Sequence, residues 1–449
     1  MGGFDLTALQ KRVMQAPPTQ YEQLYLVGFR GVLVISTFLW VFLQTFAPTT
    51  VYAAWANQDG PHDQENVRKV LSVLFWNQYF LIGSIIFLSA RSIAIPFFRN
   101  PTKESIARIL LTRPLTLCIP AAIAVAIVKG SITDDFVNNI LLRFAEGTNN
   151  NAIPIPQPLP TTLSYWNSVF NLFWVSHQFA AQAANYAYPT QTLWMITAVY
   201  IQSYTVYMTM IVVPYTRPKW RVQFSIFFII AAWWCQSWAW YTISGLIMAD
   251  MVVNMDFKVH AQRGIPVQFR NLAWRQADGR PRRIPVWSVA GLVMLGGIAM
   301  QYVWVAARPD LFTAEWEIHS NPYSIGGLNT EYQNDHTSAR DDVYLMLVGF
   351  FFLLETYDIL QRVLQNRFFV YLGSRSYSYF LIQPILIYRV GIRVFGQLRG
   401  THGIGYPGSV VVTLITCLAV TVPAAELYHR LVCVPSRYLA HHFYEFITS

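Results

Sequence analysis

The chain has 449 residues, of which 54% are hydrophobic, 16% aromatic and only 12% charged. A soluble domain of ordinary composition carries about 25% charged residues, so these values exclude that class and predict an all-α, polytopic membrane protein. The net charge of +9 would suggest nucleic acid in a soluble chain, but the basic residues here flank apolar runs. We therefore expect the lipid bilayer, and no nucleic acid, as the partner of this basic chain.

The first 26 residues contain Lys11, Arg12 and two prolines, without the apolar core or the cleavage site of a secretory signal peptide. We expect them to form a cytoplasmic segment (1–26), followed by a transmembrane domain (27–430) and a cytoplasmic tail (431–449). The four cysteines lie in or beside apolar runs, where cysteine behaves as a small apolar residue. The sequence therefore predicts no disulfide and no metal site.

Apolar runs along the chain approach the roughly 20 residues that a hydrocarbon layer about 30 Å thick requires. They predict spans at 27–48, 70–90, 112–128, 191–213, 286–306, 343–362, 369–391 and 408–428. The run 222–253 is either one long tilted helix or two short spans joined at the polar "CQSW". Two crossings place 23 of the 32 Lys and Arg residues on the cytoplasmic side, as the positive-inside rule favours. We therefore predict about ten spans, with both termini cytoplasmic.

The second long outer segment contains "TLSYWNSVFNLFWVSHQFAAQAANYA", which is rich in aromatic residues. This composition predicts a helix that lies in the outer membrane interface or dips into it. His177 lies in this stretch beside Ser176 and Gln178. It is either a catalytic residue or a packing residue of an amphipathic helix.

Carboxylates within the spans need a role, because an ionisable group at the centre of a bilayer costs roughly 2.5 to 3.5 kcal/mol on insertion scales. Glu355 and Asp358 lie three residues apart in "FFLLETYDIL", which predicts that they share one helical face. They are either catalytic or paired with an arginine at the membrane edge, such as Arg362 or Arg375.

Three further polar residues lie near predicted inner span ends. Asp250 is expected to be a helix-end carboxylate that reaches water. Glu426 and His429 lie three residues apart near the inner end of the last span. They form either a proton-transfer pair or an interfacial anchor.

A basic segment, "ARSIAIPFFRNPTKESIARILLTRPLTL", separates the second and third predicted spans and contains Arg91, Arg108 and Arg113. The planar guanidinium donates two parallel hydrogen bonds to phosphate. The segment therefore predicts either a binding site for an anionic donor such as coenzyme A, or only membrane orientation and lipid headgroup contacts.

Five stretches, in order along nearly the whole chain, carry a resemblance to a known family: "FRGVLVISTFLWVF", "WNQYFLIGSIIFLSARSI", "SIARILLTRPLTLCIP", "TLWMITAVYIQSYTVYM" and "LGSRSYSYFLIQPIL". Their order resembles the acyltransferase 3 family of integral membrane acyltransferases, particularly its fungal branch. Ten spans are also usual for that family.

The resemblance implies transfer of an acyl group, often acetyl, from a coenzyme A thioester to a hydroxyl of a small natural product, lipid or carbohydrate. Acyl-CoA would be a co-substrate, with no permanently bound cofactor, and the membrane would be that of the endoplasmic reticulum. Arg30, in the first motif, would hold a thioester oxygen or a carboxylate of another span. Ser376, Tyr379 and Gln383, spaced three and four apart, are expected to face the interior as substrate-binding residues.

The chain departs from the family's pattern at three titratable positions. No histidine follows Arg30 at the usual distance of about ten residues, Val199 and Tyr200 stand where a glutamate is usual, and Gln383 stands where a histidine is usual. Two interpretations follow. The chain is an acyltransferase whose base lies elsewhere, or it is a diverged member that acts as a carrier, scaffold or small-molecule binding protein in a biosynthetic pathway.

If the chain is an acyltransferase, the sequence leaves several residues as the base. The outer candidates are His177 and His62. The inner candidates are His429 and the pair of Glu355 and Asp358.

Overall fold

The computed structural model describes residues 23–51, 61–148, 150, 152–174, 182–235, 237–266, 283–308 and 339–448. These residues form helices connected by short loops, with one antiparallel strand pair, β1 (Ile265–Pro266) and β2 (Arg283–Ile284). The helices of the first half are α2 (Leu24–Phe46), α3 (His62–Phe75), α4 (Gln78–Arg99), α5 (Lys103–Ser131), α6 (Asp134–Phe136), α7 (Leu142–Thr148), α8 (Thr162–Trp174), α9 (Ala183–Ala187), α10 (Trp194–Val212), α11 (Pro218–Trp234) and α12 (Ala239–Asn254). The second half contains α13 (Phe257–Arg263), α14 (Val286–Tyr302), α16 (Asp341–Thr356), α17 (Asp358–Leu364), α18 (Arg367–Ser374), α19 (Ser376–Leu386), α20 (Ile392–Gly400), α21 (Tyr406–Tyr428) and α22 (Val434–Thr448).

Several of these helices are long and apolar enough to cross a membrane. The described part of the chain contains seven, or eight if the bent pair α16 and α17 is one span. This confirms an all-helical protein with the character of a multi-pass membrane protein. The run 222–253 is divided, as "CQSW" suggested, into α11 and α12, each slightly shorter than a full span. Ten crossings and the side of each terminus stay predictions.

The predicted span 343–362 is not one straight helix but a bent pair of helices. Helix α16 ends at Thr356 and α17 begins at Asp358, and the two axes differ by 101°. Two side-chain amides donate hydrogen bonds to backbone carbonyl groups at the break: Gln361 to Leu354 O at 2.8 Å, and Gln262 to Thr356 O at 3.3 Å. The break is therefore hydrogen-bonded by other parts of the chain, as an interrupted helix within a membrane protein requires.

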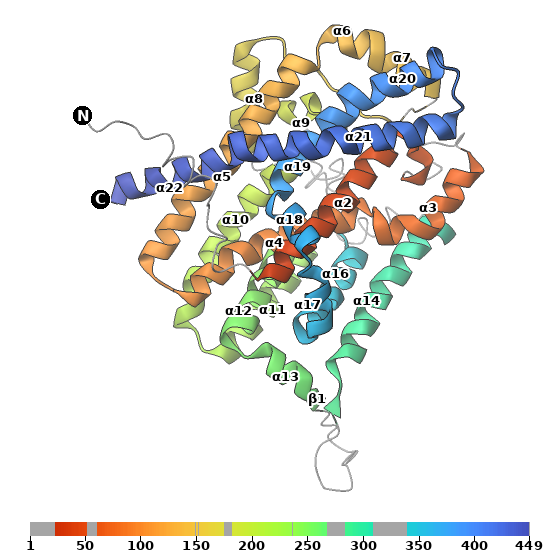
Figure 1. Ribbon diagram of the computed structural model, residues 1–449. Helices are drawn as coiled ribbons and strands as arrows, with labels where there is room; N and C mark the ends of the chain where they lie inside the picture. The colour runs from red at the N-terminus through yellow and green to blue at the C-terminus, as the bar shows by residue number, and fades with distance from the viewer. Residues whose placement is uncertain are drawn as a thin grey trace, which may run out of the picture.

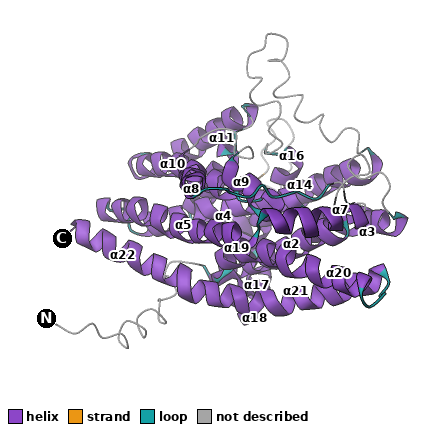
Figure 2. Cartoon of the chain, turned by 90° about the horizontal axis from the view of Figure 1, so that it is seen from above, coloured by secondary structure: helices purple, strands orange, loops and turns teal. Residues whose placement is uncertain are grey.

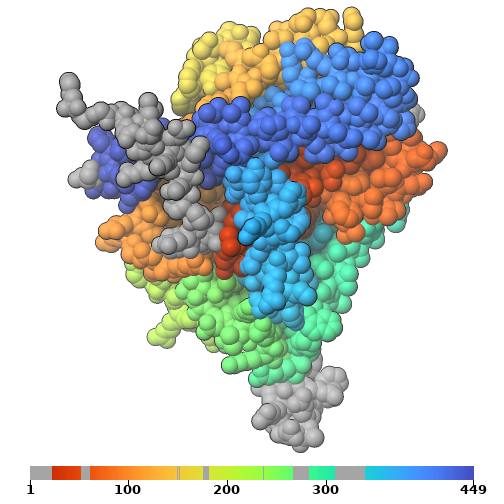
Figure 3. All heavy atoms as spheres, in the orientation of Figure 1, coloured from red at the N-terminus to blue at the C-terminus, as the bar shows by residue number. Residues whose placement is uncertain are grey.

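Helix α2 packs against α18 and against the end of α17, and glycines allow the backbones to touch. A Cβ atom added at Gly28 would overlap the carbonyl oxygen of Leu364, and one at Gly373 would overlap that of Val27. Small residues at such crossings are typical of membrane helices. Figure 3 shows the α17–α18 segment exposed on one face, between α21 and the α12–α13 region.

Helices α21 and α22 continue into one another through the π-helical turn η11 (His429–Cys433). Together they form one long helix across the molecule, and α22 packs against α5 (Figure 1). This long helix lies on the side opposite to α10 and α11 (Figure 2). The helix therefore passes without interruption through the boundary expected between 430 and 431.

The outer segment predicted to be interfacial contains α8, whose exposed side chains include Leu163, Trp166, Phe170 and Trp174. Their spacing of three or four residues forms one apolar stripe along the helix. This agrees with a helix lying at a membrane surface. Residues 154–160, which include the prolines of the sequence "PIPQPLP", form no helix or strand.

Candidate functional site

Arg91 and Glu355 form a buried ion pair within the bundle. Helix α4, which begins at the capping side chain of Asn77, carries Arg91, and the last turn of α16 carries Glu355. Their side chains are 0% and 2% exposed, with 2.5 Å between Nη1 and Oε1. Tyr25 of α2 donates to the second carboxylate oxygen at 2.7 Å, and Arg91 also donates to Gln23. Both oxygens of Glu355 are thus occupied, which makes this carboxylate a poor candidate for a catalytic base.

Asp358 does not share a face with Glu355, because the break at Tyr357 separates them. The carboxylate of Asp358 is 53% exposed and pairs with Lys258 of α13. The prediction that the two carboxylates share one helical face is therefore wrong. The sequence suggested Arg362 or Arg375 as the partner of these carboxylates. In the structure, Glu355 pairs with Arg91, and Asp358 pairs with Lys258.

Arg113 of α5 is a partly buried cation held by neutral groups. Its Nε donates to Ser203 Oγ of α10 at 2.9 Å, and its Nη2 donates to Ser89 Oγ of α4 at 2.5 Å. No carboxylate of the described chain bonds to it. Its charged or titratable neighbours are Arg30, Tyr207 and Tyr377. A second cation and two phenols therefore surround an arginine whose charge has no acidic partner in the described ranges.

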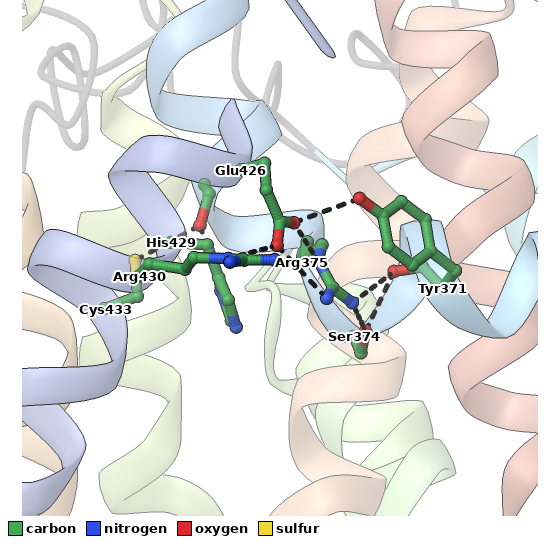
Figure 4. Close-up of polar contacts among 8 residues, drawn as sticks. Tyr371, Ser374, Arg375, Glu426, His429, Arg430 and Cys433 are labelled. Carbon is green, nitrogen blue, oxygen red and sulfur yellow. Dashed lines mark hydrogen bonds and ion pairs between the residues drawn. The ribbon is translucent and has the colours of Figure 1, made fainter. Parts of the chain in front are cut away.

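Arg375 follows α18 and reaches Glu426 of α21. The Arg375 guanidinium pairs with both carboxylate oxygens of Glu426, and Tyr371 donates to the same carboxylate at 3.0 Å. Arg430, one turn along the helix, approaches the other side at 2.7 Å. Figure 4 shows Arg375 between Tyr371, Ser374 and Glu426. Glu426 is thus fixed by two arginines and a tyrosine, which is an anchoring arrangement.

His429 faces a different group. Its Nδ1 lies 3.3 Å from Oγ of Ser378, the third residue of α19, and the same hydroxyl lies 3.3 Å from Cys433 Sγ. Ser378 and Cys433 are buried, while His429 is half-buried. An imidazole nitrogen beside a hydroxyl can accept a proton, so His429 retains the chemistry of a base. Glu426 binds the arginines, and no bond joins it to His429 among the described contacts.

Tyr379 and Gln383 point inward, as their spacing predicted, and Ser376 is only half-buried. Gln383 is 0% exposed, yet among the described residues neither atom of its amide has a hydrogen-bond partner, and the hydroxyl of Tyr379 also has none. Tyr379 packs against Val34 of α2 and Ala425 of α21. Unpaired polar groups in such surroundings are unfavourable by about 1–3 kcal/mol each.

The remaining predicted residues do not join these groups. Arg108 is exposed on α5, and His62 is exposed at the start of α3 with Glu65 3.8 Å away. His177 lies outside the described residues. Asp250 is 1% exposed and pairs with Arg221 at 3.2 Å, so the expectation of a water-exposed carboxylate is wrong.

The sequence did not single out Ser89, Ser203 or Ser378 as functional residues. All three lie within the quoted motifs, but a serine in a membrane helix most often bonds to its own backbone, as Ser203 does with Val199 O at 2.7 Å. Only the packing of α4, α5 and α10 assigns Ser89 and Ser203 to Arg113. No periodicity in the sequence carries that information.

In the part of the chain that the structure describes, no group of three or more His, Cys, Asp or Glu residues could hold a metal ion. Comparison of the chain with models of protein families, with curated proteins and with solved structures found no match.

Proposed function

We propose that the chain is a membrane acyltransferase that moves an acyl group from a coenzyme A thioester to a hydroxyl of a small natural product, lipid or carbohydrate. The order of the five sequence motifs supports this class of reaction. The observation that carries the proposal is Arg113, a partly buried cation whose guanidinium, in the part of the chain that the structure describes, is hydrogen-bonded to two serine hydroxyls and to no carboxylate.

A guanidinium held in this way has a reason to bind an anion. Removal of a charged group from water is unfavourable unless a partner of opposite charge compensates it. Two serine hydroxyls position Arg113 without neutralising it, and Arg30 adds a second positive charge nearby. In the proposed reaction, Arg113 stabilises the negative charge that develops on the thioester oxygen. Its remaining N–H groups are suited to a carboxylate or phosphate oxygen.

His429 is the proposed base. Tyr377, a neighbour of Arg113, is followed directly by Ser378, which contacts His429, so the two groups flank the start of α19. The acceptor oxygen attacks the thioester carbon, forming a C–O bond as the C–S bond breaks. The hydroxyl proton passes to His429 and then to the departing thiolate, which leaves as coenzyme A. The atoms and charges balance without a further reactant.

The test uses the full-length chain in detergent or liposomes, with labelled acetyl coenzyme A and a panel of hydroxylated acceptors. We expect Arg113→Gln to lower kcat/KM by about 10²-fold or more, the effect of losing one oxyanion donor. Arg113→Lys retains charge but loses the fixed fork and should be intermediate. Arg399→Gln, which removes an exposed arginine stacked on Phe395 and Tyr406, is the matched control. Absence of transfer and of coenzyme A binding in the unmodified chain would exclude the proposal.

The second candidate function is binding or transport of an amphipathic small molecule without chemistry. It is favoured by Gln383, whose buried amide nitrogen and oxygen have no hydrogen-bond partner within the described ranges. A bound hydroxyl could satisfy both. The acceptor panel separates the two functions, because a binding protein would be stabilised by an acceptor without consuming acetyl coenzyme A.

A further inference from the structure

A hollow of about 230 Å³ lies where four segments meet: the first turn of α2, the end of α12, the start of α13 and the break between α16 and α17. Glu355 and Tyr25 line it, together with Asp256 and Lys258. Neither Arg113 nor its partners Ser89 and Ser203 are among the residues that line it. The acyl-transfer proposal assigns no role to this hollow.

The charges around the hollow leave one carboxylate without a partner. Glu355 is neutralised by Arg91, and Lys258 is neutralised by Asp358. Asp256 lies exposed between α12 and α13 in a left-handed conformation, with φ 46° and ψ 41°. Its backbone oxygen contacts His260, but no side chain in the described ranges pairs with its carboxylate. The hollow therefore has an excess of negative charge.

Helix ends of both polarities border the hollow. Helices α12 and α16 end beside it with partial negative charge, whereas α2 and α13 begin beside it with partial positive charge, so the preference for a cation rests on Asp256 and on the aromatic rings. The rings of Tyr25 and Phe257 also line the space. Aromatic faces attract cations, especially where water is scarce. Val252 and Val259 provide apolar wall for a hydrocarbon group.

We propose that this hollow is a binding site for a small organic ammonium ion. The ammonium group lies against the Asp256 carboxylate and the aromatic rings, and its hydrocarbon part contacts Val252 and Val259. The carboxylate of Glu355, which also lines the hollow, is neutralised by Arg91. The site would operate whether or not the chain transfers acyl groups.

The probe is butylammonium, tested on the full-length chain in detergent by the midpoint of thermal unfolding. We expect butylammonium chloride to raise the midpoint saturably, while sodium chloride at equal ionic strength and n-butanol at equal concentration do not. Asp256→Asn should weaken the apparent Kd at least tenfold. Glu445→Gln, which removes an exposed carboxylate of α22, should leave the Kd unchanged.

A second variant keeps the experiment decisive if Asp256→Asn folds poorly. Val259→Trp fills the hollow from an exposed position of α13 and leaves every charge in place, so it should abolish the stabilisation. Equal shifts with butanol or sodium chloride would overturn the proposal. So would an unchanged Kd in both Asp256→Asn and Val259→Trp. Loss of acyl transfer with retained butylammonium binding would count against the enzyme proposal alone.

Discussion

Glu355 and Asp358 are three residues apart in the chain but occupy different environments. Glu355 is buried against Arg91 and Tyr25, whereas Asp358 is exposed beside Lys258. The Coulomb interaction between buried charges is strong, and so is the penalty when one partner is lost. Exposed pairs are screened by water and contribute little. Glu355 and Asp358, two carboxylates of the same predicted span, therefore contribute very differently to stability.

This difference gives a direct prediction. Glu355→Ala leaves the guanidinium of Arg91 buried without a counter-charge, so it should lower the free energy of unfolding by about 3–5 kcal/mol. Asp358→Asn should change it far less. Denaturant-induced unfolding in mixed micelles measures both values. In the double variant Arg91→Met, Glu355→Leu, much of the loss should be recovered; an equal loss in Glu355→Ala and Asp358→Asn would contradict this reasoning.

At the scale of the element, the sequence predicted one helix break and missed another. The division between α11 and α12 was suggested by "CQSW", whose polar side chains interrupt an apolar run. The break after Thr356 has no proline or glycine beside it. It is stabilised by Gln361 and by Gln262, which is 94 residues from Thr356 in the sequence. A contact over that distance is a tertiary effect, which local patterns do not contain.

On the inward face of α19, too, the sequence predicted the position of the side chains but not their tertiary contacts. Spacing correctly predicted that Tyr379 and Gln383 are buried, because positions four apart share a helical face. Spacing could not predict that the polar atoms of both side chains lack hydrogen-bond partners in the described chain. Similarly, the arginine-rich segment was recognised, but only the packing of three helices distinguishes Arg113 from exposed Arg108.

The contact between α2 and α18 leads to a prediction about glycine. Gly373→Ala should lower the free energy of unfolding by about 1–3 kcal/mol or more, because the added methyl group overlaps the carbonyl oxygen of Val27. Gly396→Ala, in α20, meets no atom within 4 Å and should stabilise that helix by about 0.5–1 kcal/mol. Thermal unfolding of the two variants in detergent compares them. Equal midpoints would mean that the two helices can separate without loss of stability.

At the scale of the whole molecule, helix length and membrane thickness do not match. The helix Tyr406–Thr448 has 43 residues, or about 65 Å at 1.5 Å per residue, which is more than twice the roughly 30 Å of a hydrocarbon core. In contrast, α11 and α12 have 17 and 16 residues, or about 25 Å each. The long helix must therefore extend beyond the hydrocarbon layer or tilt strongly, and the short pair must cross with little tilt if it crosses twice.

The turn between α11 and α12 provides the test of topology. Cys235 is exposed there, whereas Cys417 and Cys433 are buried and Cys118 is partly buried. If the run 222–253 crosses twice, Cys235 lies on the side of the membrane opposite to the cytosol. If it crosses once, Cys235 lies near the middle of the bilayer.

A membrane-impermeant maleimide, applied to sealed microsomes, distinguishes these arrangements. Two crossings predict labelling of the unmodified chain only after the membrane is permeabilised, and loss of that labelling in Cys235→Ser. A single crossing predicts no labelling under either condition, because a thiol in hydrocarbon forms little thiolate and the reagent does not reach it. Labelling of Cys235 in intact microsomes would place the turn in the cytosol and reverse the orientation derived from the basic residues. The seven Lys and Arg residues of 254–285 would then face the lumen, against the charge bias that supports ten spans.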